Sequence, residues 1–255
     1  MQRYYNRSMR LEVDTESKMA IHSGHKIASD KLVFSLDASN PKCYSGSGTA
    51  VNDMSNRNHT TTLVNGTGHT SSYPTSKFTF DGSDDYLSVS TLTGRIDSAD
   101  GFSVETWYRG TRTVRNHMWN FGNSSGVNFN CNFNDGPYAL WLYWEGSGGN
   151  YMLLTPSTLN SNGHGTSFTD GNIHHLVFTH NGTTNKVYYD GVDISSIFTT
   201  SGTQTMENVN ATGSYNIAGS PHYGGDIFIN RVYKKALTAD EVTSSFRADK
   251  DRFGV

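Results

Sequence analysis

The chain has 255 residues, of which 17% are charged and 12% aromatic. Lys and Arg number 20 against 23 Asp and Glu, giving a formal net charge of −3, which argues against a general nucleic-acid binder because such proteins are basic. No segment approaches the ~18 consecutive apolar residues of a membrane span, so we expect no membrane insertion. The aromatic content predicts a packed core and not disorder throughout.

The two cysteines, Cys43 and Cys131, lie far apart in the sequence and form no Cys-x-x-Cys pair. Their number excludes a disulfide framework and a cysteine zinc site. We expect two free thiols, with a single Cys43–Cys131 bridge as the less favoured alternative.

The first 30 residues differ from the rest, and we interpret residues 1–30 as an N-terminal arm. Arg3, Tyr4, Tyr5 and Arg7 lie in a stretch without acids and without a helix or strand period. Arg and Tyr are enriched in protein interfaces. We therefore expect these four residues to serve assembly by contacting another protein chain, the alternative being a disordered tail.

Residues 31–255 form the second predicted unit, in which short apolar runs alternate with Gly, Asn, Asp and Ser. A period of two in these runs is typical of half-buried strands, as in Phe102–Tyr108, where every second residue falls on one face. The predicted strands are 32–36, 77–80, 86–89, 102–108, 128–133, 138–144, 174–179, 186–189, 215–218 and 226–233.

Two dipeptides between apolar runs, Asn181-Gly182 and Asp190-Gly191, predict tight type I′ hairpin turns, which require positive φ at both central residues. One helix is predicted near the C-terminus. Thr238 is placed to be its N-cap with Glu241 at the third helical position, which is a capping box.

Many short strands followed by one late helix predict an all-β fold, a sandwich or a barrel. Strands and helices do not alternate along the chain, which excludes a Rossmann-type sheet.

Four blocks in order resemble the laminin-G-like, concanavalin A-like family of jelly rolls. They are Phe80–Leu87, Phe102–Trp107, His174–Thr179 with Val187–Val192, and Arg231–Val242, and the resemblance covers roughly residues 31–247. It implies two antiparallel sheets of about six or seven strands packed face to face, a jelly-roll sandwich with one short C-terminal helix.

The segments His22–Ile27, Leu32–Pro41 and Tyr44–Thr49 also resemble the openings of jelly-roll proteins of tailed bacteriophages, notably those of marine cyanobacteria. That resemblance implies a non-enzymatic virion structural protein on the phage surface, on the capsid, neck or tail, aiding host attachment. It would be localised to the virion as a homo-oligomer among other virion proteins. The alternative is a glycan-binding lectin-type module that contacts a host-surface glycan.

A glycoside hydrolase is the third and least favoured alternative. Such enzymes need two carboxylates on either side of the scissile bond. The glutamates on predicted strands, Glu105 and Glu145, have no acidic partner two or four residues away. Gly122–Gly126 spells Gly-x-Ser-x-Gly, but a strand pattern follows it where a nucleophile elbow needs a helix. We therefore expect no catalytic residues, no enzymatic activity and no cofactor.

Neither the histidines nor the acid-rich segment predicts a metal site. His174 and His175 are adjacent on a strand, so they point to opposite faces. Asp81–Asp85 lacks the twelve-residue calcium loop pattern and is interpreted as a turn.

Tyr138–Trp144 carries the candidate ligand-binding residues. Alternation places Leu140 and Leu142 on one face of the strand and Trp141 and Tyr143 on the other. If the leucines enter the core, the two rings lie on the outer face, where they suit stacking on a sugar or burial against another subunit. The alternative is that loops cover them.

We predict that folding does not depend on calcium, because Asn230 stands before Arg231 where many relatives carry an acid. Thermal melts with calcium and with a chelator should coincide. A rise of several degrees on adding calcium, reversed by chelation, would contradict the prediction, since selective binding to the native state stabilises it.

Overall fold

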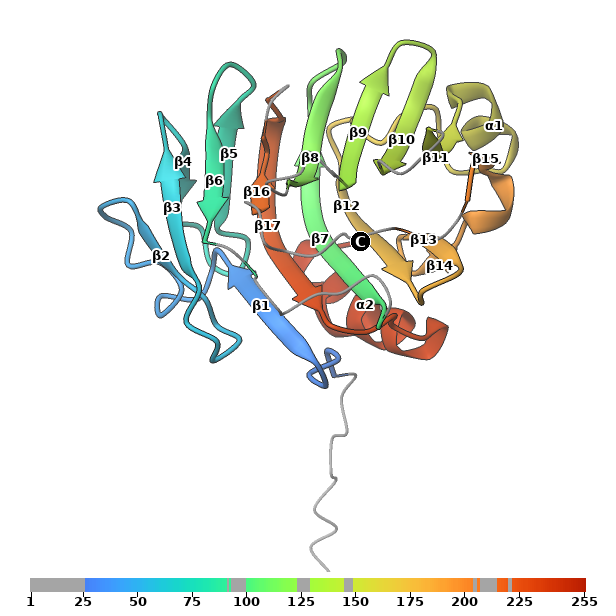
Figure 1. The fold of residues 1–255 in the computed structure, drawn as a ribbon. Coiled ribbons are helices and arrows are strands. Elements are labelled where there is room, and N and C mark those ends of the chain that lie inside the picture. The colour runs from blue at the N-terminus through green and yellow to red at the C-terminus, as the bar shows by residue number, and fades with distance from the viewer. Residues whose placement is uncertain are drawn as a thin grey trace, which may run out of the picture.

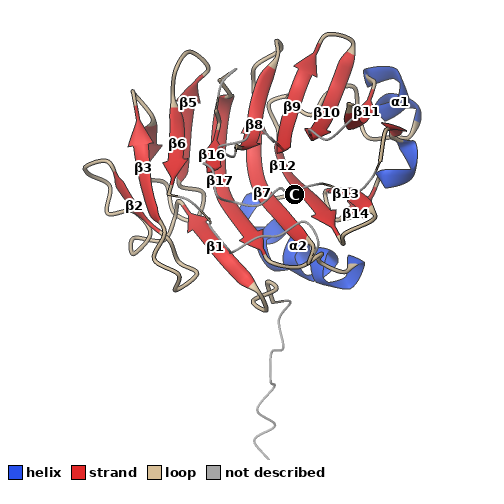
Figure 2. Cartoon of the chain, viewed as in Figure 1, coloured by secondary structure: helices blue, strands red, loops and turns tan. Residues whose placement is uncertain are grey.

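The computed structural model describes residues 26–90, 92, 100–122, 129–144, 149–203, 206, 215–219 and 222–255. The assembly residues expected in the arm, Arg3, Tyr4, Tyr5 and Arg7, lie outside the described residues, as does Ser124 of the Gly-x-Ser-x-Gly segment. In the described part, strands dominate and form two antiparallel sheets that face each other (Figure 1, Figure 2). None of the described helices is long and apolar enough to cross a bilayer.

Sheet A has eight strands, in the order β14-β13-β12-β7-β17-β5-β4, with β1 also paired to β17. Strand β17 is the longest, and it pairs with β7 on one side and with β5 and then β1 on the other. The strands are β1 (Leu32–Asp37), β4 (Gly68–Thr70), β5 (Lys77–Asp81), β7 (Phe102–Gly110), β12 (Ile173–His180), β13 (Asn185–Tyr189), β14 (Val192–Asp193) and β17 (Gly224–Tyr233).

Sheet B has nine strands, in the order β15-β11-β10-β9-β8-β16-β6-β3-β2. The strands are β2 (Ala50–Asn52), β3 (Thr60–Val64), β6 (Tyr86–Val89), β8 (Asn116–Phe121), β9 (Phe129–Asp135), β10 (Tyr138–Trp144), β11 (Asn150–Leu154), β15 (Thr199–Ser201) and β16 (Tyr215–Ile217). Together the sheets form the two-sheet antiparallel sandwich expected from the sequence.

All ten predicted strands are present, most of them within two residues of the predicted ends. The sequence patterns missed β2, β3, β4, β8, β11, β14 and β15, which are short or lack a clear apolar alternation, and they also missed two short helices. These are α1 (Pro156–Ser161), capped by the side chain of Thr155, and the 3₁₀ helix η1 (Ser195–Ile197).

The core lies between the sheets and is built from alternate residues of the strands, most of them aromatic or branched. A short polar chain crosses it. Tyr215 donates its hydroxyl to Asn230 Oδ1 at 2.8 Å, and both Asn230 Nδ2 and Trp119 Nε1 donate to Thr106 Oγ1, at 2.8 and 2.9 Å. Buried polar groups need such partners. Asn230 is therefore a buried residue with a structural role.

The two cysteines are both buried and unbridged, as expected. Cys43 and Cys131 belong to the same core cluster. Burial raises the pKa of the Cys43 thiol to about 12 and also raises that of Cys131, so both thiols are protonated and inert as nucleophiles at neutral pH.

The two hairpin predictions have different outcomes. Asp190 and Gly191 have φ of 49° and 79° and connect β13 to β14 by a tight turn, as predicted. Asn181-Gly182 lies in the predicted hairpin, between β12 and β13, but the type I′ turn is wrong, because only Gly182 has positive φ and the loop runs from Asn181 to Thr184. The reason is the Asn181 side chain, whose Oδ1 accepts the amides of Thr183 and Thr184 and so stabilises a longer loop.

Helix α2 (Ala239–Phe253) begins at the predicted capping box, with Thr238 Oγ1 accepting the Glu241 amide and the Glu241 carboxylate accepting the Thr238 amide. It lies against the outer face of sheet A (Figure 1). Phe246 stacks on Trp107 at 5.6 Å between ring centroids, and Phe253 contacts both Trp107 and Phe228. One amphipathic helix thus covers the aromatic outer residues of β7 and β17.

Beneath α2 lies a fully buried carboxylate, Glu105 of β7. It accepts hydrogen bonds from Arg231 Nη1 at 2.9 Å and the Tyr233 hydroxyl at 2.8 Å, and it lies 3.1 Å from His175 Nε2. Arg231 Nη1 also donates to Asp249 of α2 at 2.9 Å. These contacts connect three strands of sheet A to the helix.

The same contacts set the ionisation of Glu105. Burial alone would raise its pKa, but the Arg231 guanidinium, His175 and the Tyr233 hydroxyl outweigh burial and hold the pKa at about 2. The carboxylate is therefore charged whenever the protein is folded under ordinary conditions.

We predict that Glu105→Gln lowers the free energy of unfolding by about 3–5 kcal/mol, because it leaves the Arg231 guanidinium buried without its main counter-charge. Chemical denaturation measures the change. Asp193→Asn is the matched control: it removes an exposed ion pair with Lys186, so its cost should be about 1 kcal/mol or less. Equal costs in the two variants would contradict the role assigned to Glu105.

A second prediction concerns pH. The pKa of Glu105 is depressed on folding, from an ordinary value of 4.5 to about 2, so its stabilising contribution is complete above pH 4.5 and is lost as the pH falls toward 2. The stability difference between the wild-type protein and Glu105→Gln should therefore shrink across that window. A difference that stays constant from neutral pH to pH 2 would show that the carboxylate charge contributes nothing.

Candidate functional site

The predicted ligand-binding residues, Trp141 and Tyr143, lie on the outer face of sheet B. Their neighbours on β10, Leu140 and Leu142, are buried in the core. Trp141 and Tyr143 are each partly exposed. The alternation in the sequence thus placed the two faces of this strand correctly.

Cross-strand pairing adds residues that the sequence did not single out. Asn132 of β9 is the direct partner of Trp141, and His117 of β8 is the direct partner of Asn132. Partners in register share a face of the sheet, so His117, Asn132 and Trp141 form a row across three strands. Tyr143 and its partner Tyr151 of β11 lie on the same face. We call these five residues the aromatic face.

The row carries polar atoms that the fold leaves unused. His117 Nδ1 and Nε2, Asn132 Oδ1 and Trp141 Nε1 are buried, and none has a hydrogen-bond partner among the described residues. Unsatisfied buried polar groups are rare because each costs about 1–3 kcal/mol. The row therefore carries four polar atoms whose hydrogen-bonding capacity the described residues leave unused.

His117 is neutral at physiological pH. Burial lowers its pKa to about 4, with the charges of Arg115 and His222 acting in the same direction. A neutral imidazole has one N–H donor and one acceptor nitrogen. It therefore suits a hydroxyl group, which also donates and accepts.

The rings of the aromatic face form a cluster around Trp141. The Trp141 ring lies 5.6 Å from Tyr143 and 6.4 Å from Tyr151, measured between centroids, and 6.1 Å from Tyr138 at the start of β10. Flat apolar rings next to unpaired donors and acceptors suit a ligand that has both a flat C–H surface and hydroxyl groups.

The other candidates from the sequence have structural roles. His174 has its ring nitrogens 2.9 Å from Asp190 and 3.1 Å from Asp170, and although burial would lower its pKa, these carboxylates raise it. His175 faces Glu105 on the opposite side of the sheet, as expected for adjacent strand residues.

The acid-rich segment forms a turn between β5 and β6, as predicted. Carboxylate oxygens of Asp81, Asp84 and Asp85 lie within 4.8 Å of one another. However, Asp85 accepts the backbone amides of Gly66 and Asp81, and Asp81 accepts that of Ser83. These bonds account for the turn, and the group carries no further role in this account.

No curated protein sequence matches the chain significantly. Solved structures do. Domain 4 of AbnA, an extracellular arabinanase of Geobacillus stearothermophilus solved in complex with arabinotriose, is 17% identical with a TM-score of 0.60, over 84% of this chain and 98% of that one. The binding domain of Paraclostridial Mosquitocidal Protein 1 is 14% identical with a TM-score of 0.63, over 86% of this chain and 52% of that one.

The botulinum neurotoxin serotype D ligand-binding domain, solved in complex with N-acetylneuraminic acid, is 15% identical with a TM-score of 0.62. The match covers 86% of this chain and 51% of that one, so this chain spans about half the length of the toxin domains. At these identities the likeness shows the fold alone.

The family is shown by the sequence itself. The sequence model of Laminin_G_3 matches residues 81–243, more than half of the chain. This range runs from the end of β5 to the start of α2 and includes the whole aromatic face. The chain therefore belongs to the Laminin_G_3 family of the concanavalin A-like lectin/glucanases superfamily.

Proposed function

We propose that this protein is a non-enzymatic glycan-binding module and that the aromatic face of sheet B is its contact surface. The observation that carries the proposal is the row of unpartnered polar atoms on His117, Asn132 and Trp141 beside the rings of Tyr143 and Tyr151. A sugar ring offers hydroxyl groups to the first and an apolar C–H surface to the second.

The two sheets differ in a way that supports this choice. On sheet A, the outer face of β7 and β17 is covered by α2, and Glu105 has protein partners for both carboxylate oxygens. On sheet B, Trp141 and Tyr143 of the aromatic face are partly exposed. Partly exposed rings with a few polar groups beside them are what specific ligand sites provide.

The similar structures supply a second line of support. Two of them were solved in complex with a saccharide, arabinotriose in one and N-acetylneuraminic acid in the other. They share the fold of this chain and not its side chains, so they support the class of ligand and not its identity.

The virion role remains a proposal that rests on the opening segments of the sequence. We propose that the module is displayed on the surface of a phage virion as a homo-oligomer among other virion proteins, where residues 1–30 dock and glycan binding aids host attachment. The carbohydrate-binding part of this proposal stands without the virion part.

We predict that Trp141→Ala weakens glycan binding by about 1–3 kcal/mol, the range for loss of an aromatic anchor. Folding stability should fall by about 1 kcal/mol or less, because a partly exposed side chain leaves no large cavity. A glycan array followed by calorimetry on the best glycan measures binding, and Trp141→Phe, which keeps a ring, is the control. A stability loss of about 3–5 kcal/mol would instead show that Trp141 is a core residue.

Asn132→Leu distinguishes an effect on glycan binding from an effect on folding stability more clearly than Trp141→Ala does. The substitution keeps the side-chain size but removes the buried, unpartnered Oδ1, so we expect stability to stay the same or rise. Glycan binding should weaken nevertheless. If no glycan on the array binds the wild-type protein, or if Asn132→Leu binds as the wild type does, the proposed function is wrong.

A further inference from the structure

A pocket separate from the aromatic face lies where β1, the loop before β5 and the end of α2 meet. Its volume is about 310 Å³, at the lower end of the roughly 300–1,000 Å³ typical of small-molecule sites. Asp37, Ser39, Asn40, Pro41, Tyr73, Pro74 and Arg252 line it. We call it the Tyr73 cleft. It shares no residue with the aromatic face.

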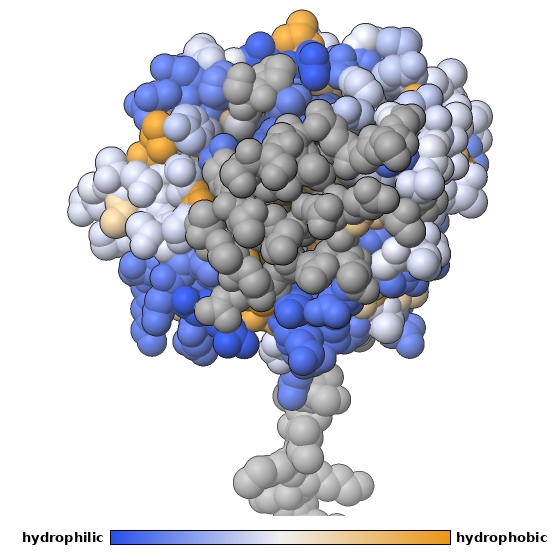
Figure 3. Space-filling model, viewed as in Figure 1, coloured by the Kyte–Doolittle hydropathy of each residue, from blue (hydrophilic) through white to orange (hydrophobic). Residues whose placement is uncertain are grey.

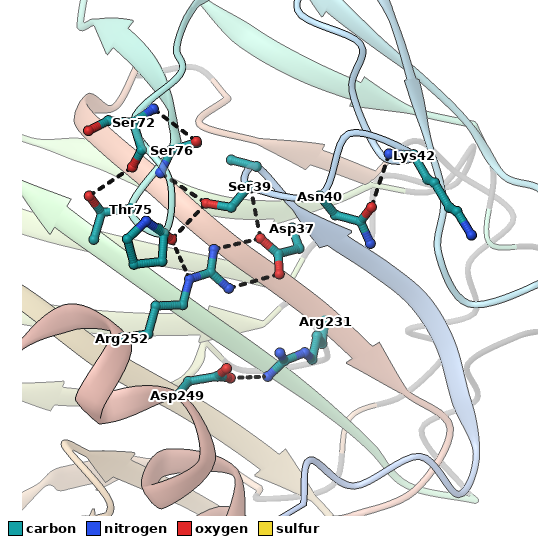
Figure 4. A network of polar contacts seen from close by, with 12 residues as sticks. Asp37, Ser39, Asn40, Lys42, Ser72, Thr75, Ser76, Arg231, Asp249 and Arg252 are labelled. Atoms are coloured by element: carbon teal, nitrogen blue, oxygen red, sulfur yellow. Dashed lines mark hydrogen bonds and ion pairs between the residues drawn. The ribbon is translucent and has the colours of Figure 1, made fainter.

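Arg252 holds the floor of the cleft in place (Figure 4). Its guanidinium forms a bidentate pair with Asp37 at 2.7 and 2.8 Å, and its Nε donates to the Pro74 carbonyl at 2.5 Å. Ser39 Oγ donates to the same carbonyl at 2.7 Å and accepts the Ser76 amide at 2.9 Å. The three segments are therefore fixed relative to one another before any ligand binds.

The charges in the cleft compensate each other. The bidentate geometry pairs the Asp37 carboxylate with the Arg252 guanidinium, so a ligand meets a neutral but strongly polar surface. An anionic ligand would have to compete with Asp37 for the guanidinium. A ligand with neighbouring hydroxyl groups can donate to the carboxylate and accept from the guanidinium without breaking the pair.

Three rings form the less polar part of the lining, those of Tyr73, Pro41 and Pro74. Tyr73 is 85% exposed, by far the most exposed large side chain among the described apolar and aromatic residues. The rings of Pro41 and Pro74 lie beside it in the lining. The Asn40 side chain adds an amide whose oxygen accepts the Lys42 amide, while its NH₂ group has no partner among the described residues. It is a donor ready for a ligand.

We infer that the Tyr73 cleft is a second saccharide site, selective for an uncharged sugar unit that stacks on Tyr73 and places its hydroxyl groups on Asn40 and the Asp37–Arg252 pair. The inference rests on the proposed function only for the class of ligand, because the two sites are built from different residues. Two sites on one chain would let a single protein hold one branched glycan, or two chains of a polymer, with higher avidity than either site alone.

The test is NMR spectroscopy of the whole protein with lactose, cellobiose and arabinotriose as neutral probes and sialyllactose as the anionic probe. The backbone amide signals of Ser39, Asn40 and Tyr73 should shift with at least one neutral probe. They should shift equally in Trp141→Ala, which impairs only the aromatic face. In Tyr73→Ala the affinity from these signals should fall about tenfold, the effect of losing an aromatic anchor.

Tyr73→Phe is the matched control, because it keeps the ring and should bind as the wild type does. Tyr73 is exposed, so neither variant should disturb folding. Signals that fail to shift with every neutral probe, shifts that persist unchanged in Tyr73→Ala, or tighter binding of sialyllactose than of lactose would each overturn the inference. Loss of all sugar binding in Trp141→Ala would overturn it too, while leaving the proposed function intact.

Discussion

One fully buried carboxylate organises the part of sheet A that lies under α2. Glu105 has no contact with solvent, and an ionised group in that position is tolerated only with full compensation from its neighbours. Arg231, Tyr233 and His175 compensate the charge of Glu105. Arg231 also donates a hydrogen bond to Asp249 of α2, which connects the network to the helix. The network thus sets where the helix sits on the sheet, and the helix in turn closes that face.

This arrangement separates the roles of the two sheets. One outer face is covered by α2, which stacks on Trp107 and is connected to the network around Glu105 through Asp249. The opposite face keeps unpartnered polar atoms on β8, β9 and β10. The C-terminal end of α2 also contributes to the Tyr73 cleft, because Arg252 extends from it to Asp37 and forms the floor of that cleft. On the side of the molecule shown in Figure 3, the described residues are mostly hydrophilic, with hydrophobic ones in small separate spots.

The features of the fold that depend on neighbouring residues in the sequence were predictable. The capping box at Thr238 and the alternation in Tyr138–Trp144 are read directly from neighbouring residues, and both are confirmed. The sequence could not predict that His117 joins Asn132 and Trp141, because that depends on the pairing register of β8 with β9, which is shifted by an irregularity after His117. The Tyr73 cleft was missed for a related reason, since its segments meet only through tertiary packing.

The measurement that tests the account most directly is amide hydrogen exchange of the whole protein, with and without the glycan that binds best on the array. The account places the ligand on the outer face of sheet B, with sheet A closed by α2. It predicts slower exchange in β8, β9 and β10 on glycan binding and no change in the covered strands β7 and β17 or in the first two turns of α2, which lie away from Arg252 and the Tyr73 cleft. Protection confined to β7, β17 and the first two turns of α2, with none in β8–β10, would contradict it.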